Sequence, residues 1–287
     1  MTKLFLKAQV KGYRRSDGVW VKPHDNGKAA AKPDAPAAPK APSKPQAKKA
    51  YYRKPALPTT PYGTHRTTAS KGLPTKIVHH PRLGEKGNRV VVNHPSKPTE
   101  APTWAASNEV ATFTPNGAAP QELNGVPVAP WTGAPKTDAG WAFVKGTKQM
   151  TEQPLMVPAG KRPASGVIIE EPDGRVWIIS PTNAFGGYQN TFPKGGTEPG
   201  LTLQQNAIKE TWEESGLQIE ITGVLGDFER TTSVSRMYLA KRVGGSPVAM
   251  GWETQAVQLV PKNKLRELMN MKPDQMVLDA YLGKKKD

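Results

Sequence analysis

The chain has 287 residues, a formal net charge of +16, no cysteine, and only 36% apolar residues. Without cysteine it has no disulfide bonds, thiolate nucleophiles or cysteine-ligated zinc. Because it also carries 29 prolines and 27 glycines, we expect much of it to pack no core, and we expect one folded unit rather than two.

The N-terminal part carries most of the charge. Residues 1–136 hold 22 Lys/Arg against 7 Asp/Glu, whereas residues 137–287 hold 18 against 17. All five histidines also lie before residue 137. We therefore place a domain boundary near residue 137 and exclude histidine chemistry from the part that follows it.

Residues 1–22 are predicted to form a small β-hairpin, because two apolar runs flank Ser16-Asp17-Gly18, a tight-turn sequence. Residues 23–136 are predicted to be a basic low-complexity linker or tail, mostly disordered, since Ala, Lys and Pro dominate its first part. Within that tail, a second hairpin is predicted to pair residues 76–80 with residues 89–93. No apolar run reaches the length of a membrane span, so we expect a soluble, unexported protein of the cytoplasm.

Residues 137–287 show alternating strand and helix signals. Strands are predicted at 166–171, 175–180, 217–228, 234–242 and 255–260, and helices at 202–215, 261–270 and 273–282. Gly216 supplies a left-handed stop for the first helix. This order predicts a mixed sheet with helices packed on its faces.

Three carboxylates crowd the end of the first predicted helix. Glu210, Glu213 and Glu214 are related by i, i+3 and i+4, so they project from one face. Their repulsion, added to an unfavourable position in the helix dipole, costs on the order of 1 kcal/mol. An exposed acidic helix is one interpretation of this cluster.

The glycine-rich stretch before that helix favours a second interpretation. Lys194-Gly195-Gly196 and Pro199-Gly200 are predicted to form a flexible, close-packing loop whose amides can meet phosphate oxygens. Carboxylates alone would repel a phosphate, whereas Mg2+ or Mn2+ would bridge the two. The cluster is then a metal site.

The same stretch resembles the signature of the Nudix hydrolases. Gly195 fits its first glycine, Glu210 the Glu that follows an Arg, Glu213 and Glu214 its Glu pair, and Gly216-Leu217 its end. The resemblance extends over about residues 137–283. It implies an α/β/α sandwich, which agrees with the order of elements above.

Three positions depart from the signature. Leu201 replaces its first Glu, Lys209 replaces its Arg, and Thr211 stands at an apolar position. Lys209 keeps the charge but lacks the forked geometry of Arg. Loss of the first Glu lowers activity, moves its work to nearby Glu198, or marks a domain that only binds.

The resemblance implies metal-dependent hydrolysis of a nucleoside diphosphate linked to another group, in which metal-activated water attacks a phosphorus atom. The implied metal ligands for Mg2+ or Mn2+ are Glu210, Glu213 and Glu214. The general base is expected to be Glu213 or Glu253, although a surface role for Glu253 is equally open.

The predicted substrate contacts are Lys194, Gly195 and Arg236. The alternative is that these residues are ordinary surface residues exposed to solvent. The identity of the group beyond the diphosphate is left open among ADP-ribose, nucleotide sugars, dinucleoside polyphosphates and capped RNA.

Two classes of function follow. The first is a pyrophosphohydrolase acting on a nucleotide-type substrate. The second is a catalytically silent module that binds a nucleotide or nucleic acid, or scaffolds a partner. The basic tail is interpreted either as a solubilising tether or as a non-specific contact for nucleic acid or another anionic partner, which salt would weaken.

Overall fold

The computed structural model describes residues 13–14, 20–21 and 77–283, and the chain divides into two compact units, Met1–Thr68 and Ala69–Asp287. In the first unit, β1 (Tyr13–Arg14) and β2 (Trp20–Val21) pair antiparallel. This pairing is the one that the predicted hairpin around Ser16-Asp17-Gly18 requires. The rest of that hairpin and the predicted tail up to residue 76 lie outside the described residues.

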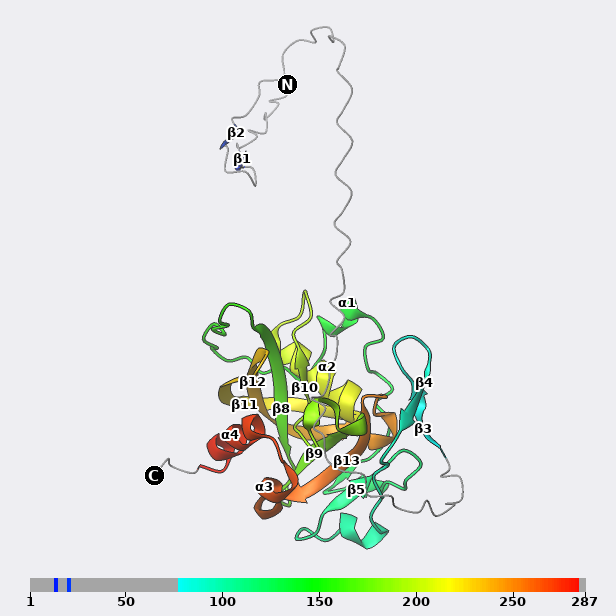
Figure 1. Ribbon diagram of the computed structural model, residues 1–287. Helices are drawn as coiled ribbons and strands as arrows, with labels where there is room; N and C mark the ends of the chain where they lie inside the picture. Colours follow the sequence, from blue (N-terminus) through cyan, green and yellow to red (C-terminus); the bar gives the residue numbers. More distant parts are fainter. Residues whose placement is uncertain (1–12, 15–19, 22–76, 284–287) are drawn as a thin grey trace, which may run out of the picture. The chain divides into compact units, whose positions relative to one another are not determined.

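A mixed seven-stranded sheet forms the centre of the second unit (Figure 1). Its strands lie in the order β11-β12-β8-β9-β13-β5, and β10 pairs with β8. Only β8 and β12 run parallel, and the other neighbours are antiparallel. The strands are β5 (Ala111–Phe113), β8 (Arg162–Glu170), β9 (Arg175–Pro181), β10 (Lys194–Gly196), β11 (Leu217–Glu229), β12 (Ser233–Gly245) and β13 (Thr254–Pro261). All five strands predicted after residue 137 are therefore present.

Helices cover both faces of this sheet. Side chains alternate along β8, so that Val167 and Ile169 join one core cluster with Ala207 and Ile208 of helix α2 (Leu203–Ser215). Ile168 joins the other cluster, which includes side chains of α3 (Leu265–Leu268) and α4 (Lys272–Tyr281). The predicted α/β/α sandwich is confirmed.

Helix α2 begins and ends where the sequence predicts. The hydroxyl of Thr202 accepts a hydrogen bond from the Gln205 amide, and the Gln205 side chain accepts one from the Thr202 amide. This capping box satisfies two amides that the helix itself leaves unpaired. At the other end Gly216 has φ 72°, where a Cβ would clash with the Ser246 carbonyl. The carboxylate-bearing turn is thus fixed at both ends.

The prediction of a mostly disordered tail up to residue 136 is wrong for its described part. Residues 77–136 contain β3 (Val78–Leu83), β4 (Arg89–Val92), β6 (Glu122–Leu123), β7 (Val126–Pro127) and the short helix η1 (Ala101–Trp104). The predicted pairing of β3 with β4 is confirmed. Strand β5 extends the main sheet by pairing with β13. Three large side chains of this segment, those of Trp104, Phe113 and Leu123, are buried in the core. These few contacts fix the segment in place, although its proline-rich composition indicated disorder.

Two buried arginines tie this segment to the sheet. Arg175 donates to the carbonyls of Thr103, Trp104 and Ala106. Arg242 donates to carbonyls in the β6–β7 region and forms an ion pair with buried Glu171 at 2.6 Å. Since a buried cation needs such partners, residues 77–136 are part of the folded domain.

The remaining elements are short. They are α1 (Asp138–Trp141), η2 (Thr182–Gly187), η3 (Pro247–Ala249) and η4 (Lys262–Lys264). The helix predicted at 261–270 is interrupted, because η4 and α3 divide it and Met269 is already extended. The helix predicted at 273–282 is α4, which buries Val277 and Leu278 while Met276 is exposed. No helix among the described residues has the length and apolar character that crossing a membrane requires.

Candidate active site

The acidic end of α2 lies against strand β10. Glu210, Glu213 and Glu214 are all partly buried. Lys194 and Gly195 of β10 pair with Gly166 and Ser165 of β8, so residues 194–196 are a strand rather than the predicted flexible loop. The predicted close packing is present, because a Cβ on Gly195 would overlap the Glu210 carboxylate.

Glu210 has no internal partner among the residues that the structure describes. Burial, and then the charge of Glu213, raise its pKa to about 8. In the part of the chain that the structure describes, its side chain has no hydrogen bond and no ion pair. An ionised carboxylate in such a setting is costly unless a cation meets it.

Glu214 has one internal contact. Its Oε2 accepts a 2.7 Å hydrogen bond from the backbone amide of Lys194. Burial is the main reason that its pKa rises to about 8, and the charge of Lys194 opposes this rise. The amide of Lys194 is thereby occupied, while its ammonium lies 4.9 Å from the Tyr188 ring centroid and donates to Thr191.

Glu213 is held by the lysine that replaces the signature arginine. Lys209 Nζ lies 2.9 Å from Glu213 and 2.5 Å from Glu198. Burial alone would lower the pKa of Lys209, but hydrogen bonds to these two carboxylates raise it. Glu198, the residue considered as a substitute for the glutamate missing at Leu201, is thus joined to the acidic face through Lys209.

Glu253 lies close enough to influence this face. Its charge contributes to the raised pKa values of Glu210 and Glu214. Although the residue is exposed overall, reduced hydration of its carboxyl, followed by the charges of Glu85 and Glu213, raises its own pKa. A base with a raised pKa is suited to take a proton near neutral pH. Sequence reasoning missed Glu85, since a hairpin turn residue carries no signal of its position.

The acidic face suits a divalent cation in its chemistry. Its donors are hard carboxylate oxygens, which Mg2+ and Mn2+ prefer, and no ion pair to Glu210 is present in the described part of the chain. Among the described residues, however, no three His, Asp or Glu side chains converge as a ready-made metal site. Glu213 is ion-paired with Lys209, so a cation at this face would compete with Lys209 for that carboxylate.

The arginine predicted to contact substrate is engaged within the protein. Arg236 is only 4% exposed and donates two 2.7 Å hydrogen bonds to Asp227 and one of 3.0 Å to Glu152. Its contact with substrate stays a prediction. Three other basic side chains of the β11–β12 hairpin are also paired within the protein: Arg230 with Asp274, Lys241 with Glu220, and Arg242 with Glu171.

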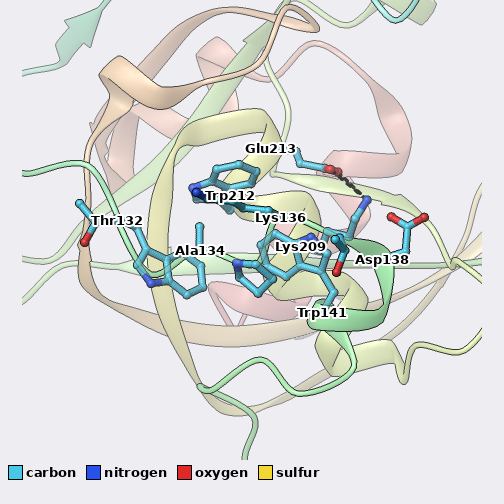
Figure 2. Close-up of a pocket in the computed structure, with 11 residues that line it drawn as sticks. Thr132, Ala134, Lys136, Asp138, Trp141, Lys209, Trp212 and Glu213 are labelled. Carbon is cyan, nitrogen blue, oxygen red and sulfur yellow. Dashed lines mark hydrogen bonds and ion pairs between the residues drawn. The ribbon is translucent and has the colours of Figure 1, made fainter.

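A cavity of about 300 Å3 adjoins the acidic face. Figure 2 shows Trp141 and Trp212 lining it together with Lys209 and Glu213. Trp131 also lines it. Sequence reasoning placed Trp212 on the apolar stripe of its helix and did not single out Trp131 or Trp141. The sequence feature that could have indicated the cavity is the pair Trp131 and Trp141, which lie ten residues apart beside the predicted domain boundary.

Comparison with known proteins agrees with the geometry. A family model described as "NUDIX domain" matches residues 160–280. Residues 160–280 form a Nudix domain. The Nudix domain begins just before β8 and ends within α4, so the segment from β3 to α1 lies outside it.

Curated relatives match the Nudix domain over part of their length. The RNA pyrophosphohydrolase of Caulobacter vibrioides is 38% identical over 63 residues, which are 22% of this chain and 37% of that protein. That of Cronobacter sakazakii is 32% identical over 118 residues, which are 40% of this chain and 59% of that protein. The chain therefore spans less than two thirds of the length of either relative.

Solved structures of similar fold include a Nudix hydrolase from Nitrosomonas europaea. It is 22% identical, with a TM-score of 0.39, over 45% of this chain and 73% of that one. An ADP-ribose pyrophosphatase from Streptococcus suis is 17% identical, with a TM-score of 0.35, over 44% of this chain and 94% of that one.

Proposed function

We propose that this chain hydrolyses a phosphoanhydride bond in a nucleoside diphosphate that is linked to a second group. The observation that carries the proposal is the face formed by Glu210, Glu213 and Glu214, where Glu210 packs against Gly195 and has no hydrogen bond or ion pair among the described residues. The spacing of these residues within a Nudix domain supports it.

The chain's own residues divide the work in this proposal. Glu210, Glu213 and Glu214 would hold Mg2+ or Mn2+, which when bound neutralises phosphate charge and activates water. The Lys194 ammonium places a positive charge beside the same face. Glu253 is the candidate general base, because its raised pKa and its proximity to the trio fit that role.

We propose the 5′-phosphorylated end of RNA as the substrate class. The curated relatives bear the name RNA pyrophosphohydrolase, which supports this choice. The composition of the N-terminal unit also supports it, since residues 1–68 hold 15 Lys/Arg against 3 Asp/Glu. A chain of such charge attracts a phosphate backbone.

Hydrolysis of a substrate panel tests the activity. The full chain with Mg2+ or Mn2+ is expected to release phosphate or pyrophosphate from 5′-triphosphate RNA, with ADP-ribose, nucleotide sugars and dinucleoside polyphosphates as comparisons. Glu210→Gln should abolish this turnover while circular dichroism stays unchanged. Near-parental turnover by that variant contradicts the proposal.

A silent binding module is the second candidate function. The observation that favours it is the ion pair between Lys209 and Glu213, which occupies one of the three carboxylates, together with Leu201 at the position of the family's first glutamate. Saturable binding of RNA without release of any phosphate across the panel would select this candidate.

A further inference from the structure

Three tryptophans from separate parts of the chain meet beside the acidic face. Trp131 precedes α1, Trp141 ends α1, and Trp212 lies on α2. The ring centroids of Trp131 and Trp141 are 6.0 Å apart at an interplanar angle of 81°. Those of Trp141 and Trp212 are 5.6 Å apart at 46°. In a perpendicular pair one ring contributes its edge, so its faces stay available to a flat ligand.

These rings line the cavity of about 300 Å3 that Figure 2 shows. This volume is at the lower end of the range of small-molecule sites, about 300–1,000 Å3, which are typically aromatic with a few polar groups. Trp141 is buried, while Trp131 and Trp212 are partly buried. The cavity is therefore sized and lined for a small flat ring.

The rim of the cavity carries polar groups of both signs. Lys136 and Asp138 are exposed and both line it. Within the described part of the chain, neither side chain has a hydrogen bond or ion pair. An ammonium donor and a carboxylate acceptor can meet the carbonyl and amino groups on the edge of a nucleobase.

The cavity and the acidic face share residues. Glu213 belongs to both, and Lys209, which is ion-paired with Glu213 at 2.9 Å, also lines the cavity. A ligand ring among the tryptophans would thus have the candidate metal ligands at one end of its site. The phosphates of a nucleotide whose base lies among the tryptophans would therefore lie at the acidic face.

We propose that the Trp131–Trp141–Trp212 cavity binds the nucleobase of the nucleotide whose phosphoanhydride is cleaved at the acidic face. The inference rests on the proposed function. Residues 131–141, which precede the Nudix domain at residues 160–280, would then form one side of the nucleobase site. Substrate recognition is thereby divided between the Nudix domain and the segment before it.

Calorimetric binding of adenosine and guanosine 5′-monophosphate to the full chain tests this inference. Ribose 5-phosphate serves as the ligand without a base. Mg2+ is present throughout so that the carboxylates do not repel the phosphate, and hydrolysis does not interfere because a monophosphate has no phosphoanhydride bond. Wild type should bind the monophosphates more tightly than ribose 5-phosphate. Trp131→Ala should weaken monophosphate binding about 5- to 150-fold, the range expected for loss of one stacked base, and leave ribose 5-phosphate binding unchanged.

Two further variants serve as controls. Trp131→Tyr keeps a ring and should restore most of the binding, which separates stacking from a loss of folding. Phe143→Ala removes an aromatic side chain that is 86% exposed and does not line the cavity, so it should bind as wild type.

Equal affinity of wild type and Trp131→Ala, or no saturable binding of either monophosphate by wild type, overturns the inference. Turnover of the substrate panel is scored separately. Hydrolysis with an unchanged KM in Trp131→Ala refutes the base site alone, whereas nucleotide binding without any turnover refutes only the proposed function.

Discussion

Gly195 determines how closely strand β10 approaches Glu210. The backbone at Gly195 is not in the left-handed region, so its role is space rather than conformation. A Cβ at this position would overlap the Glu210 carboxylate, whereas a Cβ on the neighbouring Gly196 would meet nothing within 4 Å. The two glycines thus form a matched pair in which only one touches the site.

Gly195→Ala is expected to displace Glu210 and lower kcat about 100-fold, the scale of loss for a misplacement of about 1 Å in an active site. Gly196→Ala should keep parental turnover and the same melting temperature. Steady-state kinetics of both variants check this, and equal activity of the two would show that the packing of Gly195 on Glu210 is irrelevant.

Glu210 and Glu214 also predict a pH dependence of stability. Burial raises the pKa of each to about 8, so between pH 4.5 and 8 the folded chain binds more protons than the unfolded chain. The free energy of unfolding should therefore fall as pH rises through this window in EDTA. Adding Mg2+ should restore it near pH 8.

Chemical denaturation from pH 5 to 8 measures this effect. Glu210→Gln should flatten the decline, because the amide cannot ionise. Glu220→Gln, which changes an exposed ion pair with Lys241, should leave the decline unchanged. A pH dependence of the same slope in wild type and Glu210→Gln would contradict the burial of Glu210.

At the scale of residues, spacing predicted the acidic trio but not its partners. Positions 210, 213 and 214 share a helix face wherever the helix lies. The pairing of Lys209 with Glu198 and of Arg236 with Asp227 depends on loops and strands whose relative placement only the fold supplies.

At the scale of elements, the hairpin β3–β4 is docked against the start of β13. The side chain of His80 is only 4% exposed. Its Nε2 lies 3.0 Å from the carbonyl oxygen of Thr254, and its Nδ1 accepts a hydrogen bond from the backbone amide of Arg82. These contacts require the neutral ring with its proton on Nε2. The hairpin turn brings Glu85 toward Glu253, so docking shapes the rim of the candidate site.

Acid is expected to loosen this hairpin. Burial lowers the pKa of His80 below 6.5, so the unfolded chain binds the proton more readily. The contribution of neutral His80 to the free energy of unfolding is therefore fully present above pH 6.5 and is lost as pH falls toward the pKa of His80 in the folded chain. The protection factors of the hairpin amides, which correct for the slower intrinsic hydrogen exchange in acid, should fall on acidification.

His80→Ala should produce the same loosening at neutral pH, at a cost of about 1–3 kcal/mol for the unpaired backbone groups. The exposed His94 offers a control, since its side chain has no hydrogen bond among the described residues. If His80→Ala and His94→Ala exchange alike, His80 does not anchor the hairpin.

At the scale of the whole molecule, the sequence predicted the sandwich but placed its beginning too late. The apolar patterns after residue 137 predicted the strands there. Strand β5 has only three residues, which is too short for a period, and it is recognisable only when paired with β13. The buried carbonyl acceptors of Arg175 and Arg242 are likewise supplied by residues 103–127.

Truncation tests where the domain begins. Residues 69–287 are expected to fold with the melting temperature of the full chain, because they form the larger compact unit. Residues 137–287 should fail to fold cooperatively, since they lack β5, Trp104 and Phe113 and leave two buried arginines short of acceptors. A cooperative transition of residues 137–287 at the parental temperature would contradict this boundary.

Hydrolysis at this site depends, in the proposed function, on a cation being bound by the acidic face of α2. Calorimetric titration of Mn2+ into the full chain, with a nucleoside monophosphate present, measures this most directly. Saturable binding is predicted for wild type and its loss for Glu210→Gln. The absence of saturable Mn2+ binding by wild type, or equal binding by both proteins, would contradict a metal site on α2.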